Sequence, residues 1–199
     1  MDQLPPLGRS IWEVIPKTIE IYASLLNAKS KDVILATSYE DVEGNRVLNG
    51  IPSGLVYRNL GYYFAEKHGF ETIIPDYRLV RHSGKYPSSA DDIALVLAYT
   101  KMRFGDERPL FLLGNSAGGV NILSWLLDDT FWESCVKSKV TGLISLSALM
   151  DFDGVSAPLP DVLTQYFGKE YVSRSPLAQL RYLAQSGTLE GDLPALLLL

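Results

Sequence analysis

The chain has 199 residues, of which 18 are Lys or Arg and 23 are Asp or Glu, so its formal net charge is −5. This charge argues against a nucleic-acid-binding protein, because such proteins carry a basic surface. Hydrophobic residues make up 47% and charged residues 21% of the chain, which excludes a disordered polypeptide and predicts a single domain over residues 1–199.

The first fifty residues carry weak but distinct patterns. Apolar residues recur every three or four positions between Ile11 and Leu26, which predicts an amphipathic helix within an N-terminal helical segment, residues 1–30. An apolar run over residues 33–39 is a candidate strand. The polar, glycine-bearing residues 40–49 are typical of a loop.

From Ser53 onwards, helical and strand patterns alternate. Gly69 is placed to end the first helix, and Ser88, Ser89 or Asp91 is placed to cap the second. In chain order, the pattern predicts a helix from residue 53, a strand over 70–75, a helix from about 89 to 104, a strand over 109–114, a helix over 117–127, a strand over 140–146, two short helical segments and a strand over 194–199.

The expected strands are continuous apolar runs, which is typical of strands that are buried on both faces. The fold class that follows is α/β, with a mostly parallel sheet and helices on both faces. Right-handed crossovers then bring the carboxyl ends of the strands to one edge, where sites in this class form. Residues 148–185 are either a lid over that edge or an ordinary connection.

Cysteine content and hydropathy define the setting by exclusion. Cys135 is the single cysteine, which excludes an intrachain disulfide and a thiolate metal cluster. The start at Met1 has neither the basic region nor the apolar stretch of a secretory signal. No apolar run approaches the roughly 20 residues that a membrane-spanning helix needs. We therefore predict a cytoplasmic protein with no membrane span and no metal site.

One motif carries chemistry. Gly114-Asn115-Ser116-Ala117-Gly118 fits the G-x-S-x-G pattern of a nucleophile elbow, and it lies between an expected strand and an expected helix. In this interpretation Ser116 is an acyl-transfer nucleophile, and the N–H of Ala117 forms half of an oxyanion hole. The alternative is that Ser116 only caps the helix beside closely packed glycines.

Three blocks, of which the last contains this motif, resemble in their order and spacing the hormone-sensitive-lipase-like esterases of the α/β-hydrolase superfamily. They are Pro75-Asp-Tyr-Arg-Leu79, Lys85-Tyr-Pro87 with Asp91-Asp92, and Gly114-Asn-Ser-Ala-Gly-Gly119. The resemblance, which extends from about Leu55 to Leu199, implies hydrolysis of a small-molecule carboxylic ester by a Ser-Asp-His triad without a cofactor. It also implies that Asp76 and Arg78 brace a loop near the site.

The partners of the expected nucleophile are missing from their usual places. His68 is expected to be an ordinary residue at a helix end, and His82 can approach Ser116 but precedes it, whereas the triad runs Ser, acid, His along the chain. Asp151 and Asp153 are candidates for a displaced acid or are solvated loop residues. The sequence also lacks the H-G-G-G run that completes the oxyanion hole. The chain is therefore interpreted as a partial hydrolase domain.

The function that follows is a serine carboxylic-ester hydrolase of the esterase/lipase type with impaired turnover. A non-catalytic pseudoenzyme or partial gene product that binds a ligand or partner is the first alternative. An amide or formamide hydrolase on the same scaffold is the second, since the same elbow serves any acyl transfer. The sequence leaves the substrate and the oligomeric state open, and the apolar run Leu196–Leu199 is expected to promote association.

Overall fold

The computed structural model describes residues 53–131, 139–187 and 194–199. The expected helix between residues 11 and 26, the strand over 33–39 and the loop over 40–49 lie outside these ranges. The described residues fall into two compact units, of which the first ends at Ile74 and the second begins at Pro75.

The first unit contains helix α2 (Ser53–His68), which Gly69 ends in the left-handed conformation, with φ +67°. Both features confirm the sequence-based expectation. The expected strand over residues 70–75 is wrong, because the chain there is irregular and Phe70 and Ile73 are exposed. An apolar run forms a strand only where a neighbouring ladder takes up its backbone groups, and among the described residues none pairs with this run.

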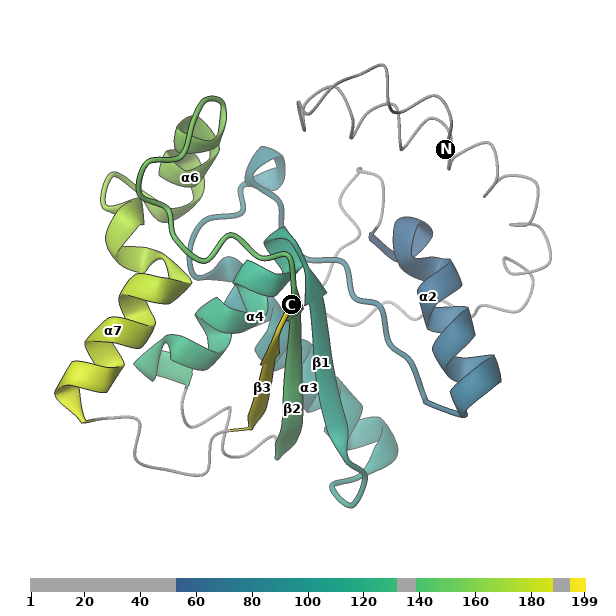
Figure 1. Ribbon diagram of the computed structural model, residues 1–199. Helices are drawn as coiled ribbons and strands as arrows, with labels where there is room; N and C mark the ends of the chain where they lie inside the picture. Colours follow the sequence, from purple (N-terminus) through teal and green to yellow (C-terminus); the bar gives the residue numbers. More distant parts are fainter. Residues whose placement is uncertain (1–52, 132–138, 188–193) are drawn as a thin grey trace. The chain divides into compact units, whose positions relative to one another are not determined.

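The second unit is built on three parallel strands, β1 (Leu110–Asn115), β2 (Val140–Leu146) and β3 (Ala195–Leu198), in the order β1-β2-β3 (Figure 1). At the carboxyl ends, Asn115 lies beside Leu146, and Ser145 lies beside Leu198. The register shifts once, between Leu110 and Phe111. The three strands therefore end at one edge, as the α/β class requires.

Three helices pack together on one face of this sheet: α3 (Ser88–Phe104), α4 (Ala117–Leu127) and α7 (Pro176–Ser186). The most apolar of them, α4, lies directly on β1 and β2 and is buried from Gly119 to Leu127. Its Leu123 and Trp125 are fully buried in a core that α3, α7 and both strands share. This arrangement confirms the α/β fold class.

The start of α3 and one face of β1 differ from the sequence-based expectations. The N-cap of α3 is Pro87, which has no side-chain cap, so none of the three expected residues caps the helix. On the sheet face opposite α4, the side chains of Phe111 and Leu113 are exposed in the described chain, although β1 was expected to be buried on both faces. The continuous apolar run predicts covered faces but does not say what covers them.

The segment that follows β2 is packed into the unit. It contains α6 (Leu159–Phe167), the 3-10 helix η4 (Tyr171–Arg174) and α7. Phe152, Leu163 and Phe167 are buried in a second apolar cluster together with Val120 of α4. Residues 148–185 thus share this cluster with α4, and both interpretations of the segment, a lid or an ordinary connection, stay predictions.

Two further 3-10 helices, η2 (Val80–His82) and η3 (Asp129–Phe131), complete the described elements. The strand β3 pairs with β2, and each of its residues is exposed. None of the described helices has the length and apolar character needed to cross a membrane.

Candidate functional site

The candidate site is the turn between β1 and α4. Ser116 occupies this turn with φ 52° and ψ −116°, a backbone conformation that a residue with a side chain rarely adopts. Its N–H donates to the carbonyl oxygen of Leu146 at 2.8 Å, and its carbonyl accepts from the N–H of Val120 at 3.1 Å. The strained residue is therefore fixed at both ends, by the neighbouring strand and by the first turn of the helix.

The hydroxyl of Ser116 is not used for capping. Ser116 stands at the N-cap position of α4, yet its side chain makes no capping hydrogen bond, and the residue is exposed. A serine that only capped the helix would adopt ordinary extended backbone angles and accept from an N–H of the first turn. This geometry disfavours the capping alternative. Strained backbone clusters at functional sites, so the conformation of Ser116 supports a functional role for it at the sheet edge.

Two glycines make the turn sterically possible. A Cβ on Gly114 would lie 2.4 Å from the carbonyl oxygen of Gly118 and 2.6 Å from the N of Gly119. A Cβ on Gly119 would lie 2.6 Å from Ser145 Oγ and 2.9 Å from Ala148 Cβ. At Gly118, by contrast, a Cβ would meet nothing within 4 Å. Gly114 and Gly119 are therefore the positions at which the turn packs too closely for a side chain, whereas Gly118 is not.

Ala117 is the first residue of α4 and is exposed beside Ser116. The first N–H groups of a helix have no acceptor within the helix, and they lie at the positive end of its dipole. The N–H of Ala117 is therefore placed where an oxyanion donor would be needed. Its role, like that of Ser116, stays a prediction.

The histidines have separate environments. His68 ends α2 in the first unit, with ring centroids 5.0 Å from Tyr63 and 6.3 Å from Phe70, in agreement with an ordinary residue at a helix end. His82 is the last residue of η2 in the second unit, and its side chain lies outside the described part. The role of neither histidine toward Ser116 is tested by these environments, and both stay predictions.

The candidate acids follow β2. Asp151 and Asp153 are both exposed, and the N–H of Asp153 donates to Asp151 Oδ1 at 3.0 Å. This contact is a local turn of the kind that loop aspartates commonly form. The arrangement fits two solvated loop residues. No group of three metal-ligating side chains is found among residues 53–131, 139–187 and 194–199.

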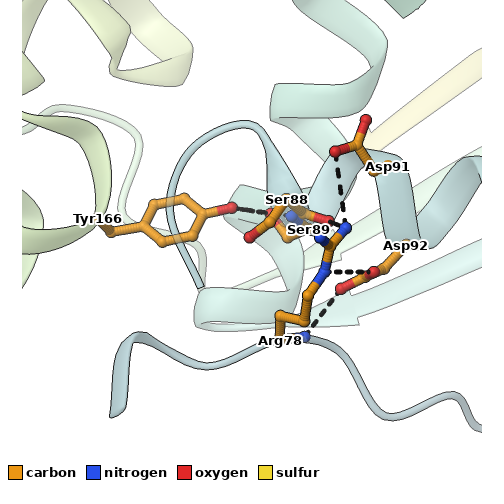
Figure 2. A network of polar contacts seen from close by, with 6 residues as sticks. All are labelled: Arg78, Ser88, Ser89, Asp91, Asp92 and Tyr166. Carbon is orange, nitrogen blue, oxygen red and sulfur yellow. Dashed lines mark hydrogen bonds and ion pairs between the residues drawn. The ribbon is translucent and has the colours of Figure 1, made fainter. Parts of the chain in front are cut away.

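Arg78 is the centre of a polar network that braces the chain before α3 (Figure 2). Its Nε donates to Asp92 Oδ1 at 2.8 Å, and its backbone N–H donates to Asp92 Oδ2 at 2.8 Å. The guanidinium also donates to the carbonyl of Ser88 at 2.8 Å and lies 3.6 Å from Asp91. Asp92 is buried, so this ion pair supports the bracing role expected for Arg78.

The same region is tied to α6 through Tyr166. Its hydroxyl accepts from the N–H of Ser89 at 3.0 Å and also bonds the Ser89 hydroxyl (Figure 2). The Tyr166 carbonyl accepts from the N–H of Tyr86 at 2.8 Å. The two residues are 77 positions apart, so this pairing has no local signal in the sequence.

A second polar cluster links Tyr86 to the end of α4. The Tyr86 hydroxyl donates to Asp128, and the guanidinium of Arg174 lies 4.4 Å from the centre of the Tyr86 ring. Burial raises the pKa of Tyr86, and Asp128 raises it further. Burial also works against the charge of Asp128, but hydrogen bonds from Thr130 and Tyr86 outweigh it and lower the pKa of this carboxyl.

Comparison with known proteins gives one family. A family model described as alpha/beta hydrolase fold matches residues 47–184, which is more than half of the chain. The matched range includes β1, the turn at Ser116 and β2. Among curated proteins, none gave a significant match to the chain.

Proposed function

The chain belongs to the α/β-hydrolase fold family, and from this premise we propose that Ser116 is the nucleophile of an acyl-transfer site of the ester-hydrolase type. The observation that carries the proposal is the backbone of Ser116, which is held at φ 52° at the carboxyl end of β1 while its hydroxyl makes no cap. Strain of this kind costs about 1–3 kcal/mol and persists where it serves a function.

In the proposed reaction the Ser116 oxygen attacks the carbonyl carbon of a carboxylic ester. The carbonyl oxygen becomes an oxyanion beside the N–H of Ala117, the alcohol leaves with a proton, and an acyl-enzyme forms. Water then adds to the acyl carbon and releases the carboxylic acid and the free serine. Each step moves a proton that the serine must lose or regain, so the rate depends on a base.

The base limits the activity that we expect from the 199-residue chain. Its two histidines, His68 and His82, both precede Ser116, whereas in this family the base follows the nucleophile along the chain. We therefore propose slow turnover. A site that keeps the nucleophile's position and one oxyanion donor retains part of the rate enhancement even when the triad is incomplete.

The esterase subgroup is part of the proposal. Support comes from Asp76-Tyr-Arg-Leu79 and from Gly114-Asn-Ser-Ala-Gly-Gly119, which resemble the hormone-sensitive-lipase-like esterases. The ion pair of Arg78 with Asp92, which braces the first block against α3, is a second support. The matched family model is the general one and does not distinguish this subgroup.

Labelling with an alkyl fluorophosphonate, followed by intact-protein mass spectrometry, tests the nucleophile. We expect wild type to gain one phosphonyl group at Ser116, more slowly than a complete serine hydrolase does, and Ser116→Ala to gain none. Ser116→Gly is the matched control for folding: it removes the hydroxyl and also the strain of the positive φ, so it is expected to stay unlabelled while being at least as stable as wild type. A folded wild-type sample that takes up no probe would refute the proposal.

A non-catalytic protein is the second candidate. It is favoured by the sequence order, because both histidines precede Ser116. If wild type is unlabelled but folded, this candidate stands, and the chain then acts through binding. If His82→Ala abolishes labelling that His68→Ala leaves intact, His82 is the base and the second candidate falls.

A further inference from the structure

A second serine stands beside Ser116 at the carboxyl edge of the sheet. The last paired residues of β1 and β2 are Asn115 and Leu146, so Ser116 and Ser147 are the next residues on two neighbouring parallel strands. The ladder continues through both of them: the Ser116 N–H donates to Leu146, and the Ser147 N–H donates to the carbonyl of Leu199 at 2.6 Å. Neighbouring strands lie about 4.8 Å apart, which puts the two backbones side by side.

The two serines also share a positive φ. Ser147 has φ 50° and Ser116 has φ 52°, a range in which glycine is the residue without steric cost. Both residues are exposed, and both stand at the point where a strand leaves the sheet. The strain at Ser147 therefore belongs to the same edge as the proposed nucleophile.

Packing below the edge holds Ser147 against the elbow. Ser145, two positions before Ser147, and Ala148, the next residue, pack closely against Gly119 in the first turn of α4: a Cβ added there would lie 2.6 Å from Ser145 Oγ and 2.9 Å from Ala148 Cβ. Ala148 also packs in the apolar cluster with Val120. Residues on both sides of Ser147 thus pack against α4. This packing restricts the movement of Ser147 away from the turn at Ser116.

We propose that Ser147 determines specificity, and that its hydroxyl donates a hydrogen bond to a substrate bound at Ser116. The inference rests on the proposed function of Ser116 and deepens it. A donor at this place favours carboxylic esters whose acyl or alcohol part carries an oxygen acceptor close to the carbonyl, over esters with an all-hydrocarbon chain. A hydrogen bond of this kind changes a rate by about three- to tenfold.

Two fluorophosphonate probes that differ in one position test this assignment. One carries an all-carbon chain on phosphorus, and the other has an ether oxygen in place of the second methylene. The measurement is the rate constant for phosphonylation of Ser116 with each probe. Wild type is expected to react about three- to tenfold faster with the ether probe.

Three variants of Ser147 separate the hydroxyl from the backbone. Ser147→Ala and Ser147→Gly remove the donor, and the glycine also relieves the positive φ, so both are expected to lose the preference for the ether probe. Ser147→Asn keeps a donor, and asparagine tolerates a positive φ, so it is expected to retain part of the preference. If Ser147 had a merely structural role, Ser147→Gly would keep the preference for the ether probe. The proposal predicts that this variant loses it.

Ser83 provides the matched control. It is an exposed serine with φ 66° at the end of η2, so Ser83→Ala and Ser83→Gly change the same groups at a serine that does not follow a strand of the sheet. Both are expected to leave the probe preference unchanged. A wild-type protein that labels without preferring the ether probe, or a Ser147→Ala variant that keeps the full preference, overturns the inference alone. A folded wild type that labels with neither probe overturns the proposed function and this inference with it.

Discussion

Replacing Gly114 by alanine is expected to destabilise the protein strongly, although the change adds a single methyl group. The new Cβ would lie 2.4 Å from the carbonyl oxygen of Gly118, and real Cβ atoms essentially never approach closer than 3.0 Å. The first turn of α4 would have to retreat from β1 by about 0.6 Å. That movement is resisted because Leu123 and Trp125 of the same helix are fully buried in the core.

The expected cost is about 3 kcal/mol, at the upper end of the range for overpacking, because backbone atoms cannot rotate out of the way. Gly118→Ala is the matched control, since its Cβ would meet no atom within 4 Å. An alanine in the first turn of a helix is neutral or stabilises by up to about 1 kcal/mol relative to glycine. The two variants have the same added atom and opposite expected signs.

Urea unfolding followed by far-ultraviolet circular dichroism measures both changes. With a slope of about 2–3 kcal/mol per molar urea for a chain of this size, the midpoint of Gly114→Ala should fall by about 1 M, and that of Gly118→Ala should stay or rise. Fluorescence of the buried Trp125, isolated by replacing Trp12 and Trp132 with phenylalanine in all the proteins compared, reports whether the core of α4 unfolds in the same transition. Equal midpoints for the two variants would refute the claim that close packing of β1 on α4 selects glycine at 114.

Two other networks carry predictions. Arg78→Met leaves the buried Asp92 without its cation and is expected to cost about 2–3 kcal/mol in the free energy of unfolding, less than for a fully buried pair because Arg78 is partly exposed and its backbone N–H still donates to Asp92. Adding Asp92→Asn should recover part of this loss, and a double variant that is no more stable than Arg78→Met would contradict the pairing. The lowered pKa of Asp128 means that its charge stabilises the fold above the pKa of about 3.9 that an unfolded Asp has, and that this contribution is lost as the pH falls through the lower folded value. Asp128→Asn should therefore have a free energy of unfolding about 1 kcal/mol below that of wild type at pH 7, and the difference should shrink near pH 2. A difference that is constant with pH, or equal to the one measured for the control Asp129→Asn, would count against this account.

The sequence predicts local structure well where the signal is local. The helix over residues 117–127 and the strand over 140–146 coincide with α4 and β2, because each is an apolar run bounded by turn residues. The failures have a common cause. Residues 70–75 have the composition of a strand, but composition does not show whether a neighbouring ladder exists. Pro87 is the N-cap of α3 in place of the expected residues, and one of these, Ser89, instead bonds Tyr166, a contact over 77 positions that the local sequence does not show.

The candidate site also combines features that a local sequence pattern predicts with features that it does not. The G-x-S-x-G pattern locates Ser116 from five consecutive residues, since a sharp turn between strand and helix imposes small neighbours. The ion pair of Arg78 with Asp92 joins residues 14 positions apart, and Ser147 reaches the edge through the register of β1 on β2. Neither placement leaves a local pattern, because each depends on which strands and helices become neighbours.

The hydrogen bond that fixes the elbow also limits its chemistry. Because the N–H of Ser116 is donated to Leu146 at 2.8 Å, it is not available to an oxyanion, and the N–H of Ala117 is the next donor along the chain. An oxyanion hole in this family takes a second donor from a separate loop, and removing one donor typically lowers a rate by about 10²–10³. The geometry of β1 and α4 therefore gives the proposed nucleophile a strained backbone and one adjacent N–H donor. The rate at which a fluorophosphonate labels Ser116 measures how much reactivity that pair retains without a histidine that follows it.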